Sequence, residues 1–306
     1  MKKVAPLLLL LKQAFINLQA NDPIRMAGAT AFFAFFALPP IVLILSSVLS
    51  RLFNDRYQRI SGQLFDKLAE LFGPKSANQL ETISHRLHLP KPSLPLTILS
   101  FILVLVASTT LFAILKNSLN QLWNIKKKSE RSFLLILLDK LIALAIILGS
   151  GFLFSLSLAL EQLTAQLSAK WSFPSFAYYQ DVTNLGHFFA SILIRMIWFA
   201  MLFKFLPDVR ISWRAVWPGA LFTSILFKAG EVILDNLLIN SSIGTLYGTS
   251  GAIILLLLFV FYASLLFYYG AAFTRQYGEW IHLAVEPNSQ AVAYTITEVD
   301  SSNTNV

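Results

Sequence analysis

The chain has 306 residues, of which 56% are hydrophobic and 13% charged, and its mean hydropathy is +0.64. A water-soluble fold of this length could not bury so much apolar surface, so the composition excludes that class and indicates a membrane protein. The net charge of +8 does not indicate nucleic-acid binding, because the basic residues lie between hydrophobic segments, and the absence of cysteine excludes disulfides and thiolate sites.

The first 26 residues predict an amphipathic helix at the membrane surface. Lys2, Lys3 and Lys12 flank the apolar run 7–11, which is too short for the core of a signal peptide and has no cleavage site after it. Such a helix lies among the lipid headgroups. We expect residues 1–26 to form a cytoplasmic helix that the mature protein retains.

Long apolar segments predict six transmembrane helices. Runs of about 20 apolar residues match the roughly 30 Å hydrocarbon core of a bilayer. The predicted spans are 27–50, 94–116, 133–160, 185–206, 215–239 and 249–273. The chain is therefore predicted to be an all-α, polytopic membrane protein with a transmembrane domain at 27–273.

Two prolines, Pro39 and Pro40, lie midway through the first span. Because proline has no N–H, the carbonyls of Phe35 and Phe36 lose their usual partners. Broken helices often line transport sites, but prolines in membrane helices can also be simple packing kinks. Pro39 and Pro40 are our candidate helix-break or gating residues, with the packing kink as the alternative.

The segment 51–93 predicts two short amphipathic helices over the outer face of the bundle. They either cap a cavity or only pack on the ends of the spans. Glu81, His85 and His88 have a spacing that would let them share one helix face and bind a metal. No second motif accompanies them, so we interpret them as a solvated face and expect no metal or other cofactor.

The fifth span, 215–239, is ambiguous, because hydropathy alone also permits a five-span chain. Six spans place most basic residues on the cytoplasmic side, whereas the short outer loops 161–184 and 240–248 hold only Lys170. This asymmetry follows the positive-inside rule. We predict that both termini are in the cytoplasm and that residues 274–306 form a cytoplasmic, partly disordered tail.

Charged residues inside the predicted spans mark the candidate site. Arg195 lies near the middle of the fourth span, and Lys228, Glu231 and Asp235 lie on one face of the fifth. At 1.5 Å per residue, Arg195 and Glu231 are roughly 17 and 24 Å from the inner boundary, within reach of an ion pair. Such charges are functional candidates, although a pair that only joins two helices is the alternative. We name Arg195, Lys228, Glu231 and Asp235 as candidate substrate-binding residues.

Several short motifs resemble a known family. They are Ala27-Gly28-Ala29-Thr30-Ala31-Phe32-Phe33, Leu119-Asn120-Gln121-Leu122-Trp123, Leu206-Pro207-Asp208-Val209-Arg210, Trp217-Pro218-Gly219-Ala220, and Tyr247-Gly248 before Gly270-Ala271. Their order resembles the YihY/BrkB family of bacterial inner-membrane proteins, formerly named ribonuclease BN. The resemblance implies six transmembrane helices, two cytoplasmic termini and a link to virulence and envelope integrity. The family usually has Gly-Ala-Glu near the end of its last span, and here Ala272 replaces the glutamate.

The expected function is transport or translocation of a lipid or another anionic or amphipathic envelope molecule. Arg195 and Lys228 would bind its anionic part, and Glu231 and Asp235 would balance their charge. The alternative is a non-transporting scaffold or envelope assembly factor. The chain has no Walker, GxSxG or HExxH motif, so we expect no enzymatic activity. Membrane lipids and an envelope protein are the expected partners, and the sequence predicts no oligomeric state.

Overall fold

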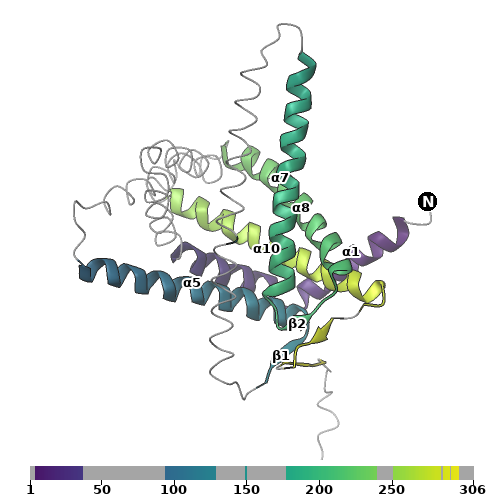
Figure 1. Cartoon of the computed structure of the whole chain (residues 1–306), viewed down its shortest axis with the longest axis horizontal. Helices are drawn as coiled ribbons and strands as arrows, with labels where there is room; N and C mark the ends of the chain where they lie inside the picture. The colour runs from purple at the N-terminus through teal and green to yellow at the C-terminus, as the bar shows by residue number, and fades with distance from the viewer. Residues whose placement is uncertain are drawn as a thin grey trace, which may run out of the picture.

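The structure, a computed structural model, describes residues 4–36, 94–128, 149, 177–239, 251–283, 285–289 and 291–295. These residues are mostly helical, as expected from the sequence (Figure 1). The helices are α1 (Val4–Gln19), the helix Pro23–Phe36, α5 (Leu94–Leu122), α7 (Ala177–Phe205), α8 (Trp213–Ile239) and α10 (Gly251–Trp280). Four short strands are β1 (Ile125–Lys127), β2 (Val209–Arg210), β3 (Glu286–Pro287) and β4 (Ala291–Ala293).

Four of these helices, α5, α7, α8 and α10, coincide with predicted spans. Among the described residues, the segment Leu257–Trp280 is long and apolar enough to cross a membrane by length and composition. The span 133–160 apart from Gly149, the segment 51–93 with Glu81, His85 and His88, and the Pro39-Pro40 break lie outside the described residues. The count of six spans therefore stays a prediction.

Helices α7 and α8 form an antiparallel pair joined by the turn that contains β2. The rings of Phe199 and Phe227 set the register of this pair, with their centroids 4.7 Å apart. Helix α8 runs without interruption from Trp213 to Ile239, so the segment that hydropathy left ambiguous is one continuous helix.

Helices α8 and α10 pack through a reciprocal pair of glycines and threonines. A Cβ atom added to Gly219 would overlap the hydroxyl of Thr274, and one added to Gly270 would overlap the hydroxyl of Thr223. Each threonine Oγ1 donates a 2.7 Å hydrogen bond to the glycine carbonyl four residues earlier in its own helix. The two backbones can approach this closely only because neither glycine has a side chain.

Short strands tie the chain together at one end of the helices (Figure 1). Helix α10 extends beyond residue 273, the predicted end of the last span, to Trp280. In the turn that follows Trp280, His282 has a left-handed φ of 58°, and the Leu283 N–H donates to the Gly278 carbonyl at 2.9 Å. This is a Schellman-type helix end, which reverses the chain direction.

After this reversal, β3 pairs antiparallel with β2, and β4 pairs antiparallel with β1. The sequence predicts a tail that is disordered from about residue 284. That expectation does not hold for 286–287 and 291–293, because strand pairing with the segments after α5 and α7 satisfies their backbone groups.

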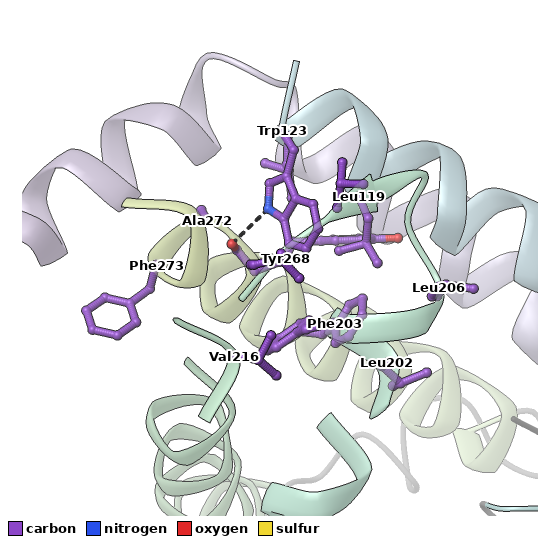
Figure 2. Packing of buried hydrophobic residues seen from close by; sticks show 14 of the residues in the cluster. Leu119, Trp123, Leu202, Phe203, Leu206, Val216, Tyr268, Ala272 and Phe273 are labelled. Carbon is purple, nitrogen blue, oxygen red and sulfur yellow. Dashed lines mark hydrogen bonds between the residues drawn. The ribbon is translucent and has the colours of Figure 1, made fainter. Parts of the chain in front are cut away.

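The core of the described residues lies beside these strands. Figure 2 shows Trp123, Leu119 and Phe203 packed around Tyr268 of α10. The Trp123 indole N–H donates to the Ala271 carbonyl at 3.0 Å. Ala272, which stands where the YihY/BrkB family usually has glutamate, is fully buried in this core.

Candidate functional site

A buried carboxylate, Asp208, lies where the ends of α5 and α7 meet. Its Oδ1 lies 2.8 Å from Lys116 Nζ, and its Oδ2 lies 3.8 Å from Lys127 Nζ. The Asn120 side chain donates to Asp208 Oδ2 at 2.8 Å and accepts the Asp208 N–H at 2.9 Å. The Asp208 carbonyl accepts the Asn288 N–H at 3.0 Å. We call Lys116, Asn120, Lys127, Asp208 and Asn288 the Asp208 cluster.

Burial makes the pairing within the Asp208 cluster energetically important. The side chains of Asp208 and Lys116 are only 9% and 12% exposed, and that of Lys127 is 32% exposed. A carboxylate removed from water needs both a counter-charge and hydrogen bonds to offset its lost hydration. The cluster supplies both and joins α5, β1, the α7–α8 turn and the chain after α10.

Further polar contacts hold the same end of the molecule together. Arg275 donates through Nη1 to the Leu122 carbonyl at 2.7 Å, and its Nε lies 2.8 Å from Glu279 Oε1. The Thr30 and Tyr268 hydroxyls are 2.6 Å apart and link the helix Pro23–Phe36 to α10. The motif 119–123 therefore contacts both the motif 206–210, through Asn120 and Asp208, and Ala271, through Trp123, although these residues are far apart in the sequence.

The Asp208 cluster was not among the sequence-predicted sites. Asn120 and Asp208 are 88 positions apart, so nothing in their spacing predicts that they meet. A usable signal was the presence of polar residues in two short motifs at the ends of apolar runs, namely Asn120 with Gln121 and Asp208 with Arg210. The arrangement favours a structural role, because lysine and asparagine side chains already occupy both oxygens of Asp208.

Basic residues gather around this end of the described chain. They are Arg25, Lys116, Lys126, Lys127, Lys128, Lys204, Arg210, Arg214 and Arg275. The other described basic residues are Lys12 of α1, Arg195 and Lys228. Acidic residues here are fewer, namely Asp22, Asp208, Glu279 and Glu286. One end of the molecule is therefore distinctly positive.

The sequence-predicted site lies farther along the α7–α8 pair. Arg195 and Lys228 are both partly buried in these two helices. Arg195 is four residues before Phe199, and Glu231 is four residues after Phe227. Because four residues are about one helical turn, Arg195 and Glu231 each lie about one turn beyond the Phe199–Phe227 contact, on the side away from the strands.

The proposed ion pair itself stays a prediction. Glu231 and Asp235 belong to α8, but their side chains lie outside the described residues, as do Pro39 and Pro40. In the part of the chain that the structure describes, no group of three or more His, Cys, Asp or Glu could hold a metal ion.

Comparison with known proteins identifies relatives over most of the chain. The family model described as "Virulence factor BrkB" matches residues 14–293. The chain is 23% identical over 271 residues to a UPF0761 membrane protein of Chromohalobacter salexigens, covering 88% of this chain and 63% of that protein. It is 22% identical over 265 residues to the UPF0761 membrane protein of Tolumonas auensis, covering 83% of this chain and 80% of that protein.

Other relatives are longer than this chain. The UPF0761 membrane protein of Saccharophagus degradans is 21% identical over 262 residues, which cover 83% of this chain but only 56% of the relative. The chain thus spans less than two thirds of the length of several relatives. No solved structure matches it.

Proposed function

The chain belongs to the virulence factor BrkB family of membrane proteins, and from this premise we propose that it binds and moves an anionic or amphipathic envelope molecule, such as a lipid. Its binding residues are Arg195 and Lys228, with Glu231 and Asp235 as balancing charges. This proposal assigns no catalytic reaction to the chain.

The α7–α8 register is the observation that carries the proposal. In it, Arg195 and Glu231 each lie about one turn beyond the Phe199–Phe227 contact, and Lys228 directly follows Phe227. A cationic side chain at the centre of a membrane helix costs about 2.5–3.5 kcal/mol on insertion scales. Arg195 and Lys228 on packed helices therefore support a site for negatively charged groups, which would be Glu231, Asp235 and the anionic headgroup of the ligand.

The basic end of the molecule supports an orientation. Cytoplasmic segments near membrane helices are enriched in Lys and Arg. We therefore propose that the strands and the Asp208 cluster face the cytoplasm of a bacterial inner membrane, with both termini on that side. No ATP-binding motif is present in the sequence, so movement of the ligand would be passive, ion-coupled or driven by a partner.

A scaffold is the second candidate function, and the Asp208 cluster favours it. The cluster, the strand pairs and the close α8–α10 contact form a rigid end, which suits a fixed platform for an envelope protein partner. In that case Arg195 and Glu231 would only hold α7 against α8.

Reconstitution separates the two functions. The purified protein is placed in vesicles with a fluorescent anionic lipid in one leaflet, and exposure of that lipid in the other leaflet is followed with a membrane-impermeant quencher. The transporter hypothesis predicts exposure well above that of protein-free vesicles, with a neutral lipid as control. Rates equal to those of protein-free vesicles for both lipids would favour the scaffold.

A further inference from the structure

One face of α8 carries a row of exposed apolar side chains. Trp213, Trp217, Leu221 and Ile225 follow one another at intervals of four residues, and each is between 41% and 51% exposed. Residues four apart share a helix face, and 1.5 Å per residue places Ile225 about 18 Å from Trp213. The row begins beside the strands and becomes purely aliphatic away from them, as expected for a face that enters lipid.

Aromatic rings cluster where this row begins. Trp213 and Trp217 stack with centroids 5.7 Å apart, and Phe205 of α7 meets Trp213 edge-on at 6.1 Å. A Cβ atom on Gly278 of α10 would lie 3.4 Å from Ala215, so the half-exposed Trp280 lies near the level of Trp213. Tryptophans gathered at one level typically mark the headgroup layer.

Cations adjoin these rings. Lys204 Nζ lies 5.5 Å from the centroid of the Trp213 ring and donates to the Ile211 carbonyl. Arg214 is exposed in the first turn of α8, three residues before Trp217. Arg210 contributes less, because strand pairing sets Glu286 opposite it. Lys204 and Arg214 therefore supply the positive charge of this surface.

We propose that Lys204, Phe205, Trp213, Arg214 and Trp217 form a binding surface for anionic phospholipid headgroups, named here the α7–α8 corner. The tryptophans lie in the headgroup layer, Arg214 binds the lipid phosphate, and the Leu221–Ile225 part of the row contacts the acyl chains. The cations match the negative charge of such lipids, and the length of the whole row from Trp213 to Ile225, about 18 Å, matches the depth of one leaflet. This inference does not depend on the intramembrane charges of the proposed function.

Tryptophan fluorescence provides the test, because bromine atoms on acyl chains quench indoles that they touch. The full chain is reconstituted in vesicles of phosphatidylcholine and phosphatidylglycerol, with bromine on one lipid or the other. The fluorescence of the double variant Trp213→Phe/Trp217→Phe is subtracted from that of the unmodified protein, which leaves the contribution of the two tryptophans in the α7–α8 corner. We expect stronger quenching per molecule by brominated phosphatidylglycerol, and we expect Arg214→Gln to reduce this preference about fivefold, equivalent to about 1 kcal/mol per basic residue.

The matched control is Lys126→Gln, which removes an exposed cation from β1 at the same end of the molecule and should leave the preference unchanged. Equal quenching by the two lipids in the unmodified protein would overturn the proposal. So would an Arg214→Gln variant that keeps the preference, or one that loses quenching by both lipids, since that loss would give Arg214 a role in insertion and not in lipid choice.

Discussion

At the residue scale, the described part of the molecule depends on a few buried polar groups. Asp208 is paired with Lys116 and Lys127 and hydrogen-bonded by Asn120 in a site that water scarcely reaches. A buried ion pair of this kind stabilises a protein little more than a well-packed apolar pair would. Removing only one partner, however, leaves the other charge uncompensated. Single and paired substitutions therefore give different results.

Asp208→Asn should be strongly destabilising. The amide keeps the shape of the side chain but removes the negative charge that faces Lys116 and Lys127, and breaking a buried ion pair in this way costs about 3–5 kcal/mol. Thermal unfolding of the purified protein in detergent measures the loss. Asp22→Asn is the matched control, because the Asp22–Arg25 pair is 75% and 64% exposed and should contribute no more than about 1 kcal/mol. Equal losses in the two variants would contradict a structural role for the Asp208 cluster.

A double-mutant cycle tests the ion pair that the sequence predicts between Arg195 and Glu231. Arg195→Leu alone should destabilise the protein by a few kcal/mol, because it leaves Glu231 without its partner inside the membrane. The double variant Arg195→Leu/Glu231→Leu should recover much of that loss. The measurement is the unfolding midpoint in detergent for both single variants and the double variant. If the two single losses simply add, Arg195 and Glu231 do not interact.

At the element scale, close backbone approach between α8 and α10 replaces the hydrophobic driving force that helices lack in lipid. Gly219 faces Thr274, and Gly270 faces Thr223, so each helix contributes one glycine and one threonine to the contact. The pairs are symmetric about the crossing point. Both glycines are therefore expected to be equally intolerant of a side chain.

Gly219→Ala and Gly270→Ala should each destabilise the protein by about 1–3 kcal/mol, the usual cost of overpacking. Gly28→Ala is the control, because an added Cβ there meets nothing within 4 Å. Alanine is the better helix former, so that variant should be neutral or stabilised by up to about 1 kcal/mol. Unfolding in detergent compares all three, and a Gly219→Ala variant as stable as Gly28→Ala would mean that the α8–α10 contact is looser than described.

Helix positions followed from the sequence, but their ends and contacts did not. Long apolar runs predict α5, α7, α8 and α10 to within several residues, because hydropathy can be read from each local stretch of sequence. Helix α5 continues through Asn120 to Leu122, and α10 continues to Trp280, because tertiary partners satisfy their polar residues. The β1–β4 and β2–β3 pairs join positions far apart in sequence through backbone bonds, which leave no periodic signal.

The same limit applies to the sites. Intramembrane charges are visible in a sequence, so Arg195, Lys228, Glu231 and Asp235 could be named in advance. The Asp208 cluster could not be named in advance, because its residues lie near the ends of the spans. Lysine and aspartate are common at such positions. The depth of Arg195 and Glu231 was estimated from residue counts, and their pairing stays a prediction, although each lies about one turn from the Phe199–Phe227 contact.

At the scale of the whole molecule, charge distribution predicts orientation. The described basic residues gather beside the strands, which include residues from both the middle and the end of the chain. If this end is cytoplasmic, positions on β1 and β4 must be accessible from the same side of the membrane. The outer segment 51–93 must be accessible from the other side.

Cysteine labelling tests this topology. The chain itself has no cysteine, so only the introduced cysteine can react. Lys126→Cys and Val292→Cys occupy paired positions on β1 and β4 and should react with an impermeant thiol reagent only from the cytoplasmic side. Ser76→Cys should react only from outside. Labelling of Val292→Cys in intact cells would contradict two cytoplasmic termini.

The most direct test of the proposed function is the activity of the folded double variant Arg195→Leu/Glu231→Leu. An apolar pair can preserve the packing of α7 against α8 but cannot hold an anionic headgroup. Anionic-lipid transfer is measured in reconstituted vesicles, with the double variant and the unmodified protein matched in amount and in unfolding midpoint. We predict that the double variant is folded and membrane-inserted but transfers lipid no faster than protein-free vesicles. Transfer at the rate of the unmodified protein would contradict a binding role for these charges and leave them as a structural link between two helices.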